Sequence, residues 1–299
     1  MRTTRLLVLI LLPLSALERG LGGELTPAEK KATIAYIESL RDKETGAYKV
    51  TAEGKPSLKA CNGAVKSLRA LGEKVTEIEK IQKFVLKCCD PKTGAFAEPD
   101  GKPDVTITCI GIIAACEVGI DKKVFPKAMG YVLENAKTFE EVRIAAAAVE
   151  AWGTKGLKLN PLIEVVDKAA ESPVNDPQDG SAREVAAVAV SSLRFEHAIA
   201  DFVRDLFLTS VLEPGQCADG GWRKKGEKAS DIETTYRVMR AFKMLDSKPK
   251  DRAQLQKFTA SHRNKDGGYA TVPGGPSSMS GVYYSLIITK WVGEMEARK

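Results

Sequence analysis

The sequence is poor in aromatic residues, which make up 6% of the chain, and it has only two histidines among 299 residues. It has no P-loop, no dinucleotide-binding glycine fingerprint and no nucleophile elbow. No cysteine spacing is typical of a zinc knuckle, and no Lys/Arg block with interleaved aromatics points to nucleic acid. These absences argue against the common nucleotide-dependent classes and against a nucleic-acid partner. Alanine-rich stretches instead favour closely packed helices over sheets.

The overall composition is that of a soluble globular protein. Hydrophobic residues make up 43% and charged residues 28%, the net charge of +6 is spread along the chain, and the length allows a sizeable core. The six cysteines are an even number, which export to an oxidising compartment would allow to pair. The sequence leaves their pairing open.

The first 22 residues have the layout of a secretory signal peptide. Arg2 and Arg5 precede an apolar run from Leu6 to Leu17, which is too short for a membrane span. We therefore expect residues 1–22 to be a signal peptide, residues 23–299 to form one domain, and the protein to be secreted or exported. An uncleaved anchor and a buried first helix are the alternatives, and no later segment is expected to cross a membrane.

The stretch from Gln216 to Leu245 shows the unit from which the chain is built. Gly220 and Gly221 can adopt positive φ and so predict a sharp turn, which the ring of Trp222 would pack against neighbouring helices. A basic loop follows, and from Asp231 the apolar residues recur on two faces of a helix. A helix that is apolar on two sides is expected to lie between others.

Similar units recur along the chain with a period of roughly 35 to 50 residues, as in repeat architectures. Each unit pairs an amphipathic outer helix with an apolar inner one. The first begins at a capping box at Thr26. The expected outer helices lie near 27–40, 78–87, 124–133, 161–170, 198–212 and 252–262, and the inner ones near 56–71, 104–118, 140–152, 181–195, 231–245 and 278–291. The last inner helix is apolar all round, so we expect it to be covered by the first pair. The predicted fold is all-α, a closed (α/α)6 toroid of six outer–inner helix pairs.

The turns resemble those of the prenyltransferase and squalene-cyclase repeat superfamily over nearly all of the chain after the leader. Gln216, Gly220 and Trp222 match the Gln-x-x-x-Gly-x-Trp turn of triterpene cyclases. The Asp-Gly-Gly-aromatic turns look most like those of protein prenyltransferase β subunits. The resemblance implies the toroid, whereas the reaction must be argued from the site residues.

The resemblance also implies where a catalytic zinc would lie. It places Asp231 on the family's zinc-binding aspartate, Glu233 on its cysteine and Gly281 on its histidine. Thiolate and imidazole ligands are what select zinc, so we expect no zinc and no zinc-activated transfer at this position. Asp231 and Glu233 are the candidate catalytic residues, and their oxygen atoms could hold a magnesium ion.

The basic residues that grip the isoprenoid diphosphate in the family match Lys225 and Lys228. We expect these two lysines to bind an anionic head group, and Tyr236 and Tyr284 to contact an apolar tail. Each residue also has a structural interpretation. The lysines would lie on a solvated loop, the tyrosines would be core residues, and Asp231 would be a helix N-cap.

Other chemistries on the same ring find less support. No two aspartates are adjacent, so the acid that protonates an alkene in triterpene cyclases is missing, and so is a thioester segment. Glu117, Glu150 and Glu233 fall on predicted inner helices, where a glycoside hydrolase would need two facing carboxylates. Ion pairs with inner-helix arginines are the alternative for these carboxylates; the candidates are Arg69, Arg143, Arg237 and Arg240.

Two functions therefore remain open. The first is a prenyltransferase-like toroid that handles an isoprenoid or other apolar ligand in its central cavity, with transferase activity unproven. The second is a non-catalytic secreted interaction module on the same fold, which the missing zinc ligands and the expected export both favour, since diphosphate substrates are made inside cells. A cavity lined mainly by alanine without converging charges would favour the second, and an aromatic, basic cavity the first.

Overall fold

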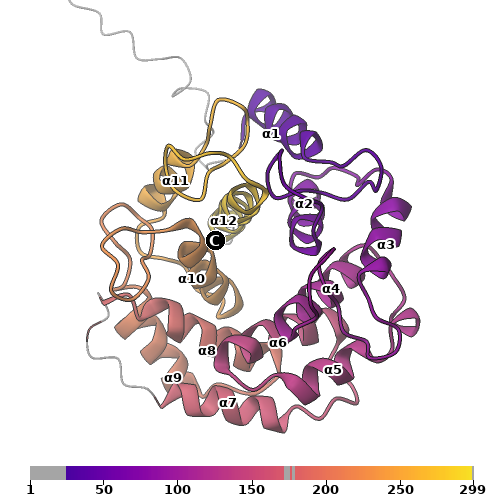
Figure 1. Cartoon of the computed structure of the whole chain (residues 1–299). Helices are drawn as coiled ribbons and strands as arrows, with labels where there is room; N and C mark the ends of the chain where they lie inside the picture. The colour runs from indigo at the N-terminus through magenta and orange to yellow at the C-terminus, as the bar shows by residue number, and fades with distance from the viewer. Residues whose placement is uncertain (1–24, 172–175, 177–178, 298–299) are drawn as a thin grey trace, which may run out of the picture.

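The computed structural model describes residues 25–171, 176 and 179–297, and over this part the chain forms twelve α-helices and no β-strand. Consecutive helices alternate between the outside and the inside of a ring (Figure 1). The outer helices are α1 (Pro27–Ser39), α3 (Ile78–Lys87), α5 (Ala128–Asn135), α7 (Asn160–Ala170), α9 (Asp201–Phe207) and α11 (Arg252–Ser261). The inner helices are α2 (Leu58–Ala70), α4 (Val105–Glu117), α6 (Phe139–Trp152), α8 (Ala182–Arg194), α10 (Ile232–Met244) and α12 (Met279–Ala297). These six pairs confirm the predicted toroid.

The ring is closed by the last helix pair. Each inner helix packs against the next, and α12 packs against α2. The backbone N–H of Met279 donates to the carbonyl of Val50 at 2.9 Å, and Arg263 forms an ion pair with Glu29 at 3.4 Å. Trp291 of α12 is 8% exposed. The apolar final helix is therefore covered by the first pair, as its composition predicts.

The predicted signal peptide, residues 1–22, lies outside the described residues. Among the described helices, none combines the length and the apolar character that crossing a membrane requires.

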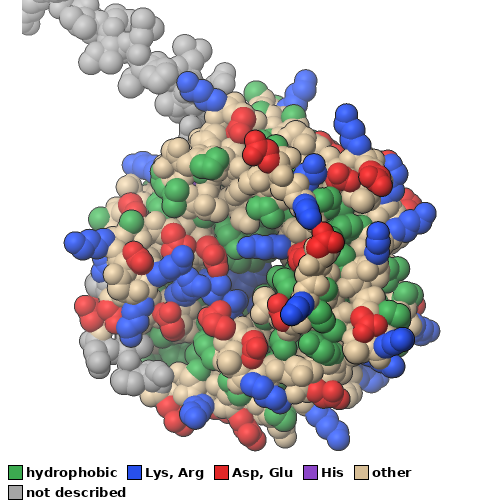
Figure 2. All heavy atoms as spheres, viewed as in Figure 1, with side chains coloured by type: hydrophobic (Ala, Val, Ile, Leu, Met, Phe, Trp, Pro, Cys, Tyr) green, Lys and Arg blue, Asp and Glu red, His purple; other side chains and the backbone are tan. Residues whose placement is uncertain are grey.

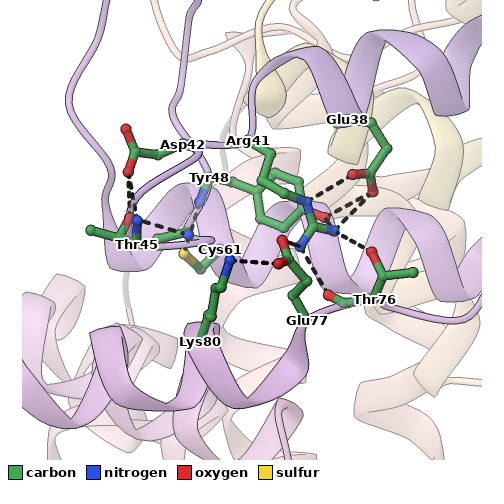
Figure 3. Close-up of polar contacts among 10 residues, drawn as sticks. Glu38, Arg41, Asp42, Thr45, Tyr48, Cys61, Thr76, Glu77 and Lys80 are labelled. Atoms are coloured by element: carbon green, nitrogen blue, oxygen red, sulfur yellow. Dashed lines mark hydrogen bonds and ion pairs between the residues drawn. The ribbon is translucent and has the colours of Figure 1, made fainter.

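The first glycine turn shows how a unit is fixed to the next (Figure 3). The carboxylate of Asp42 accepts hydrogen bonds from the N–H of Thr45 at 2.9 Å and from its hydroxyl at 2.7 Å. Gly46 follows with φ of 70°, and a Cβ there would lie 2.6 Å from the Cβ of Lys80 on α3. Glycine is thus required both by the backbone angle and by the close approach of the next outer helix.

The aromatic residue after the glycine ties the turn to the inner helix. The N–H of Tyr48 donates to Sγ of Cys61 at 3.3 Å, and its hydroxyl donates to Glu38 at 3.0 Å (Figure 3). Equivalent bonds recur at nearly the same spacing. The N–H of Phe96 donates to the hydroxyl of Thr108, 12 residues on, at 3.0 Å, and that of Trp222 donates to Thr235, 13 residues on, at 3.0 Å. The repeated units therefore share a hydrogen bond as well as a sequence pattern.

The turn at Gly220 agrees with the prediction in part. Gly220 has φ of 92°, and Trp222 is fully buried, with its indole N–H donating to the carbonyl of Leu212 at 2.8 Å. Gly221 is not in the left-handed region, contrary to expectation. It is glycine because a Cβ there would lie 2.8 Å from the ring of Phe258.

Two outer helices differ from their predicted bounds. The segment expected at 124–133 begins as a short 3₁₀ turn, Lys122–Val124, and α5 starts only at Ala128. Pro126 explains the gap, since proline has no N–H to donate and disfavours helical geometry in the residue before it. The helix expected at 198–212 is α9 followed by a wider π-helical turn, Leu208–Leu212.

Candidate functional site

A cavity of about 510 Å³ runs into the ring between the inner helices, and all six of them contribute to its lining. Figure 2 shows the hollow at the centre of the ring, with blue Lys and Arg side chains inside it. The lining includes six cationic side chains and three carboxylates. The cations are Lys59, Lys66, Arg143, Arg194, Arg237 and Arg240, and the carboxylates are Glu117, Glu150 and Glu233. The cavity is therefore a basic one.

The cavity lining combines apolar and polar side chains, and α4, α6 and α8 contribute both kinds. Ile110 and Ile113 of α4, Ile144 of α6 and Val190 of α8 form an apolar wall together with several alanines. The facing helices α10 and α12 contribute tyrosines and arginines. A volume of this size with mixed apolar and polar walls is typical of small-molecule sites.

One charged cluster lies near the N-terminal ends of α6, α8 and α10. Arg237 lies 2.5 Å from Glu233 and 3.7 Å from Glu140, and Arg143 lies 3.0 Å from Glu140. Arg183 lies 3.8 Å from Glu233. Burial acts to raise the pKa of Glu140 and Glu233, but the neighbouring arginines outweigh it and lower both values. The three arginines of this cluster thus share two carboxylates.

A second charged cluster lies toward the C-terminal ends of the inner helices. Arg194 lies 2.9 Å from Glu150, and Glu117 lies 2.5 Å from Arg69 and 3.9 Å from Lys66. Burial lowers the pKa of Arg194 to about 10. Each cluster joins residues from corresponding positions of neighbouring inner helices. This is expected because the inner helices run parallel.

Aromatic rings surround Arg240 in this second cluster. Tyr236 stacks on Trp291 with ring centroids 5.4 Å apart, and its hydroxyl lies 2.6 Å from that of Tyr283. Tyr284 also packs against Tyr236, at 5.0 Å between ring centroids. Arg240 donates to the hydroxyl of Tyr236. The predicted cavity tyrosines therefore form part of a connected network of rings and cations.

The structure separates the six residues singled out from the sequence. Glu233, Tyr236 and Tyr284 line the cavity. Asp231 is the N-cap of α10, where its carboxylate accepts from the N–H of Thr234 at 2.9 Å.

The two lysines of the basic loop lie elsewhere. Lys225 is exposed and lies 3.6 Å from Asp179, on the lining of a second cavity between α8 and the π-helical turn. Lys228 is exposed on the same loop. Neither lysine is among the residues that line the axial cavity.

The residues at the family's zinc position do not fit a zinc ion. Glu233 is held in an ion pair with Arg237, and Asp231 caps a helix. At Gly281 even a Cβ would lie 2.1 Å from the carbonyl oxygen of Tyr269, so the backbone leaves no room for an imidazole. Within the described residues, no three His, Cys, Asp or Glu side chains converge as metal ligands would.

The sequence reasoning identified several of the inner-helix ion pairs but missed Lys66 and Arg194. Glu117 and Glu233 pair with Arg69 and Arg237 as proposed, whereas Arg240 takes no carboxylate among the described residues. The sequence signal for Arg194 is its place at the end of an inner helix composed mainly of alanine and valine. In the structure this arginine is only 9% exposed. A charged residue at that register faces either the cavity or a partner.

The comparison with protein families agrees with this architecture. A family model described as "Prenyltransferase alpha-alpha toroid domain" matches residues 2–153 and 183–298. Among solved structures, the chain is similar to Candida albicans protein geranylgeranyltransferase-I complexed with GGPP, at 13% identity and a TM-score of 0.37, over 93% of this chain and 86% of that chain. No curated protein matches. Because the family model covers most of its length, the chain belongs to the family of prenyltransferase alpha-alpha toroid domains.

Proposed function

We propose that the axial cavity binds an amphiphilic anion, such as an isoprenoid diphosphate or a similar lipid-like acid. The observation that carries the proposal is the excess of cations over carboxylates, six against three, in a cavity that also has an apolar wall. Anions attract guanidinium and ammonium groups strongly where water is scarce. An apolar chain gains by covering isoleucine, valine and alanine side chains.

The cavity lining also distinguishes ligand binding from the alternative of a non-catalytic interaction module. An interior of alanine without converging charges would favour that alternative. The charged lining favours ligand binding instead, and it does so whether or not the ligand reacts. Transferase activity remains a hypothesis that rests on family membership, and any metal would have to be held otherwise than by the family's zinc ligands.

Binding of labelled farnesyl diphosphate to the purified protein tests the proposal. Saturable binding that unlabelled compound displaces is the expected result. An Ala147→Trp substitution fills the cavity next to Ile144 and should abolish the binding. Ala229→Trp, on an exposed loop residue, is the matched control and should leave it unchanged. Absence of binding by the wild-type protein, or binding that survives Ala147→Trp in a folded protein, would refute the proposal.

We further propose that residues 1–22 direct export, on the basis of their charged start and short apolar run. N-terminal sequencing of the protein recovered from its native cells tests this. A mature chain that starts near residue 23 is the expected result, and an intact Met1 on protein inside the cell contradicts it.

A further inference from the structure

The outer helix α9 presents a ridge of apolar side chains to solvent. Phe202 is 75% exposed and Leu206 is 54% exposed. They lie four residues apart, so both side chains project from one face of the helix. Arg204, on the opposite face, donates to the backbone carbonyl of Leu245 at 2.8 Å. The ring is therefore contacted by another face of α9, and the ridge faces solvent.

An apolar cavity adjoins this ridge. The second cavity, of about 460 Å³, lies among α7, α8 and the π-helical turn, and Leu206 is part of its lining. These helices occupy one sector of the ring together with α9 (Figure 1). Most of the lining is apolar, and it includes Phe139, Val185, Phe207 and Val211. An exposed apolar ridge beside a cavity that can take a large side chain is typical of protein interaction sites.

This sector is acidic although the chain as a whole is basic. Residues 160–212, from the start of α7 to the end of the π-helical turn, contain nine Asp and Glu but four Lys and Arg, whereas the net charge of the chain is +6. Two of those four cations are paired inside the ring. Arg183 lies 3.8 Å from Glu233, and Arg194 lies 2.9 Å from the carboxylate of α6. The outer surface of the sector therefore carries an excess of negative charge.

The carboxylates of α9 lie directly beside the ridge. Asp201 and Asp205 each precede one of the two ridge residues, and both are exposed. Neither takes part in an ion pair within the part of the chain that the structure describes. On the lining of the second cavity, Lys225 lies 3.6 Å from Asp179, whereas Glu184 has no ion pair among the described residues. The unmatched charges on the exposed face of α9 and in the cavity lining are thus carboxylates, which a cationic partner would neutralise.

We propose that the α9 surface, formed by the ridge, its two flanking aspartates and the second cavity, binds an amphipathic helix of a partner protein that carries Lys and Arg beside its apolar face. Side chains four residues apart, as in Phe202 and Leu206, form a ridge that fits the groove of a second helix. One large apolar side chain of the partner enters the second cavity, and its cations approach Asp201, Asp205 and Glu184. This inference is independent of what the axial cavity binds.

Fluorescence anisotropy with the full chain and a labelled 18-residue helical peptide of Leu and Lys tests the inference. Saturable binding with a Kd on the order of 10 μM is the expected result, since the surface is small. The affinity should fall as salt is added, because the carboxylates are exposed. A peptide with Glu in place of Lys, and another with Ser in place of Leu, should each bind at least about tenfold more weakly, because each loses one of the two complementary features.

Variants of the ridge locate the binding. Phe202→Ser/Leu206→Ser should raise the Kd of the Leu/Lys peptide about tenfold or more, because it removes the apolar contact. Val124→Ser/Val272→Ser is the matched control, since these two apolar residues are exposed to a similar degree on other segments. It should change the Kd less than about twofold. Circular dichroism melts establish that each variant is folded.

Variants of the charges and of the cavity test the remaining contacts. Asp201→Asn/Asp205→Asn should raise the Kd at least about threefold and weaken its dependence on salt, whereas Glu44→Gln/Glu53→Gln, on exposed residues of the first unit, should do neither. Ala170→Trp places a ring at the lining of the second cavity from an exposed position at the end of α7. It should raise the Kd about tenfold, and a Trp on an exposed loop outside this surface should leave the Kd unchanged.

Farnesyl diphosphate binding by the same variants keeps this inference distinct from the proposed function, because none of these substitutions touches the axial cavity. If the wild-type chain does not bind the Leu/Lys peptide, or if a folded Phe202→Ser/Leu206→Ser variant binds it equally well, this inference fails whatever the result with farnesyl diphosphate. Sedimentation velocity may not show a wild-type dimer that this double variant dissociates, since a second copy would then occupy the surface. 2-Phenylethylamine that binds more tightly than the peptide would identify a small-amine site and would also overturn the inference.

Discussion

The hydroxyl of Tyr236 lies 2.6 Å from the hydroxyl of Tyr283, across the contact between α10 and α12. Tyr236 in turn accepts from Arg240 and packs against Tyr284 and Trp291. The bond therefore joins the last two inner helices at the wall of the cavity. Its energetic contribution can be measured separately from ligand binding.

Tyr283→Phe should lower the free energy of unfolding by about 1 kcal/mol, because it removes one partly buried hydrogen bond and keeps the ring. Urea denaturation followed by circular dichroism measures this. Tyr284→Phe is the matched control, since its hydroxyl has no hydrogen bond within the described residues and its loss should change stability by less than about 0.5 kcal/mol. Equal effects of the two substitutions would show that the hydroxyl pair contributes nothing.

Closure of the ring depends on Gly267, which has φ of 84° and whose carbonyl accepts from the hydroxyl of Thr33 at 2.8 Å. A Cβ at Gly267 would lie 2.5 Å from the carbonyl oxygen of Ala32 on α1. Gly267→Ala should therefore separate the last unit from the first and destabilise the fold by on the order of 3 kcal/mol or more.

Gly274→Ala provides the control for that substitution. Gly274 has a similar φ of 76°, but nothing lies within 4 Å of a Cβ placed there. Gly274→Ala should lower the free energy of unfolding only by the cost of the left-handed backbone conformation, about 1 kcal/mol. If the two alanine variants unfold at the same urea concentration, the contact between Gly267 and α1 does not hold the ring closed.

The fold could be predicted further than the site, and the reason is physical. Turn glycines such as Gly46 and Gly220 are required by local backbone angles and close approaches, so their spacing in the sequence reveals the repeat. Asp231 likewise caps its helix through bonds that span three residues.

The cavity residues depend on contacts between distant helices. Lys66 and Arg240 lie on helices that the sequence predicts to be inside the ring. Whether such a cation forms an ion pair depends on residues far along the chain, such as Glu117 for Lys66. Lys225 shows the same dependence on the fold. The motif predicts that this lysine contacts a ligand, and the folded loop places its side chain on the lining of the second cavity.

The turn aspartate Asp42 predicts an acid-sensitive contribution to stability. Hydrogen bonds from the N–H and the hydroxyl of Thr45 lower the pKa of Asp42. A carboxylate whose pKa is lower in the folded state stabilises the fold above its unfolded pKa of about 3.9, and this contribution is lost as the pH falls through the folded pKa. Asp42→Asn should therefore be less stable than the wild-type protein at pH 7, and the difference should shrink below about pH 4. A difference that does not change with pH would mean that the charge of Asp42 plays no part.

The ion pair of Arg194 and Glu150 provides a test of the charged interior. The side chain of Arg194 is 7% exposed and that of Glu150 47% exposed, at a distance of 2.9 Å. Glu150→Ala leaves a buried guanidinium with neither its acceptor nor a compensating charge, and it should cost on the order of 2 kcal/mol of stability. Arg194→Met/Glu150→Ala removes both charges and should recover part of that loss. The exposed pair of Lys55 and Asp100, each 78% exposed, is the control, and Asp100→Ala should cost less than about 0.5 kcal/mol. If Glu150→Ala is as mild as Asp100→Ala, water screens the cavity charges, and the anion binding proposed for the axial cavity loses its physical basis.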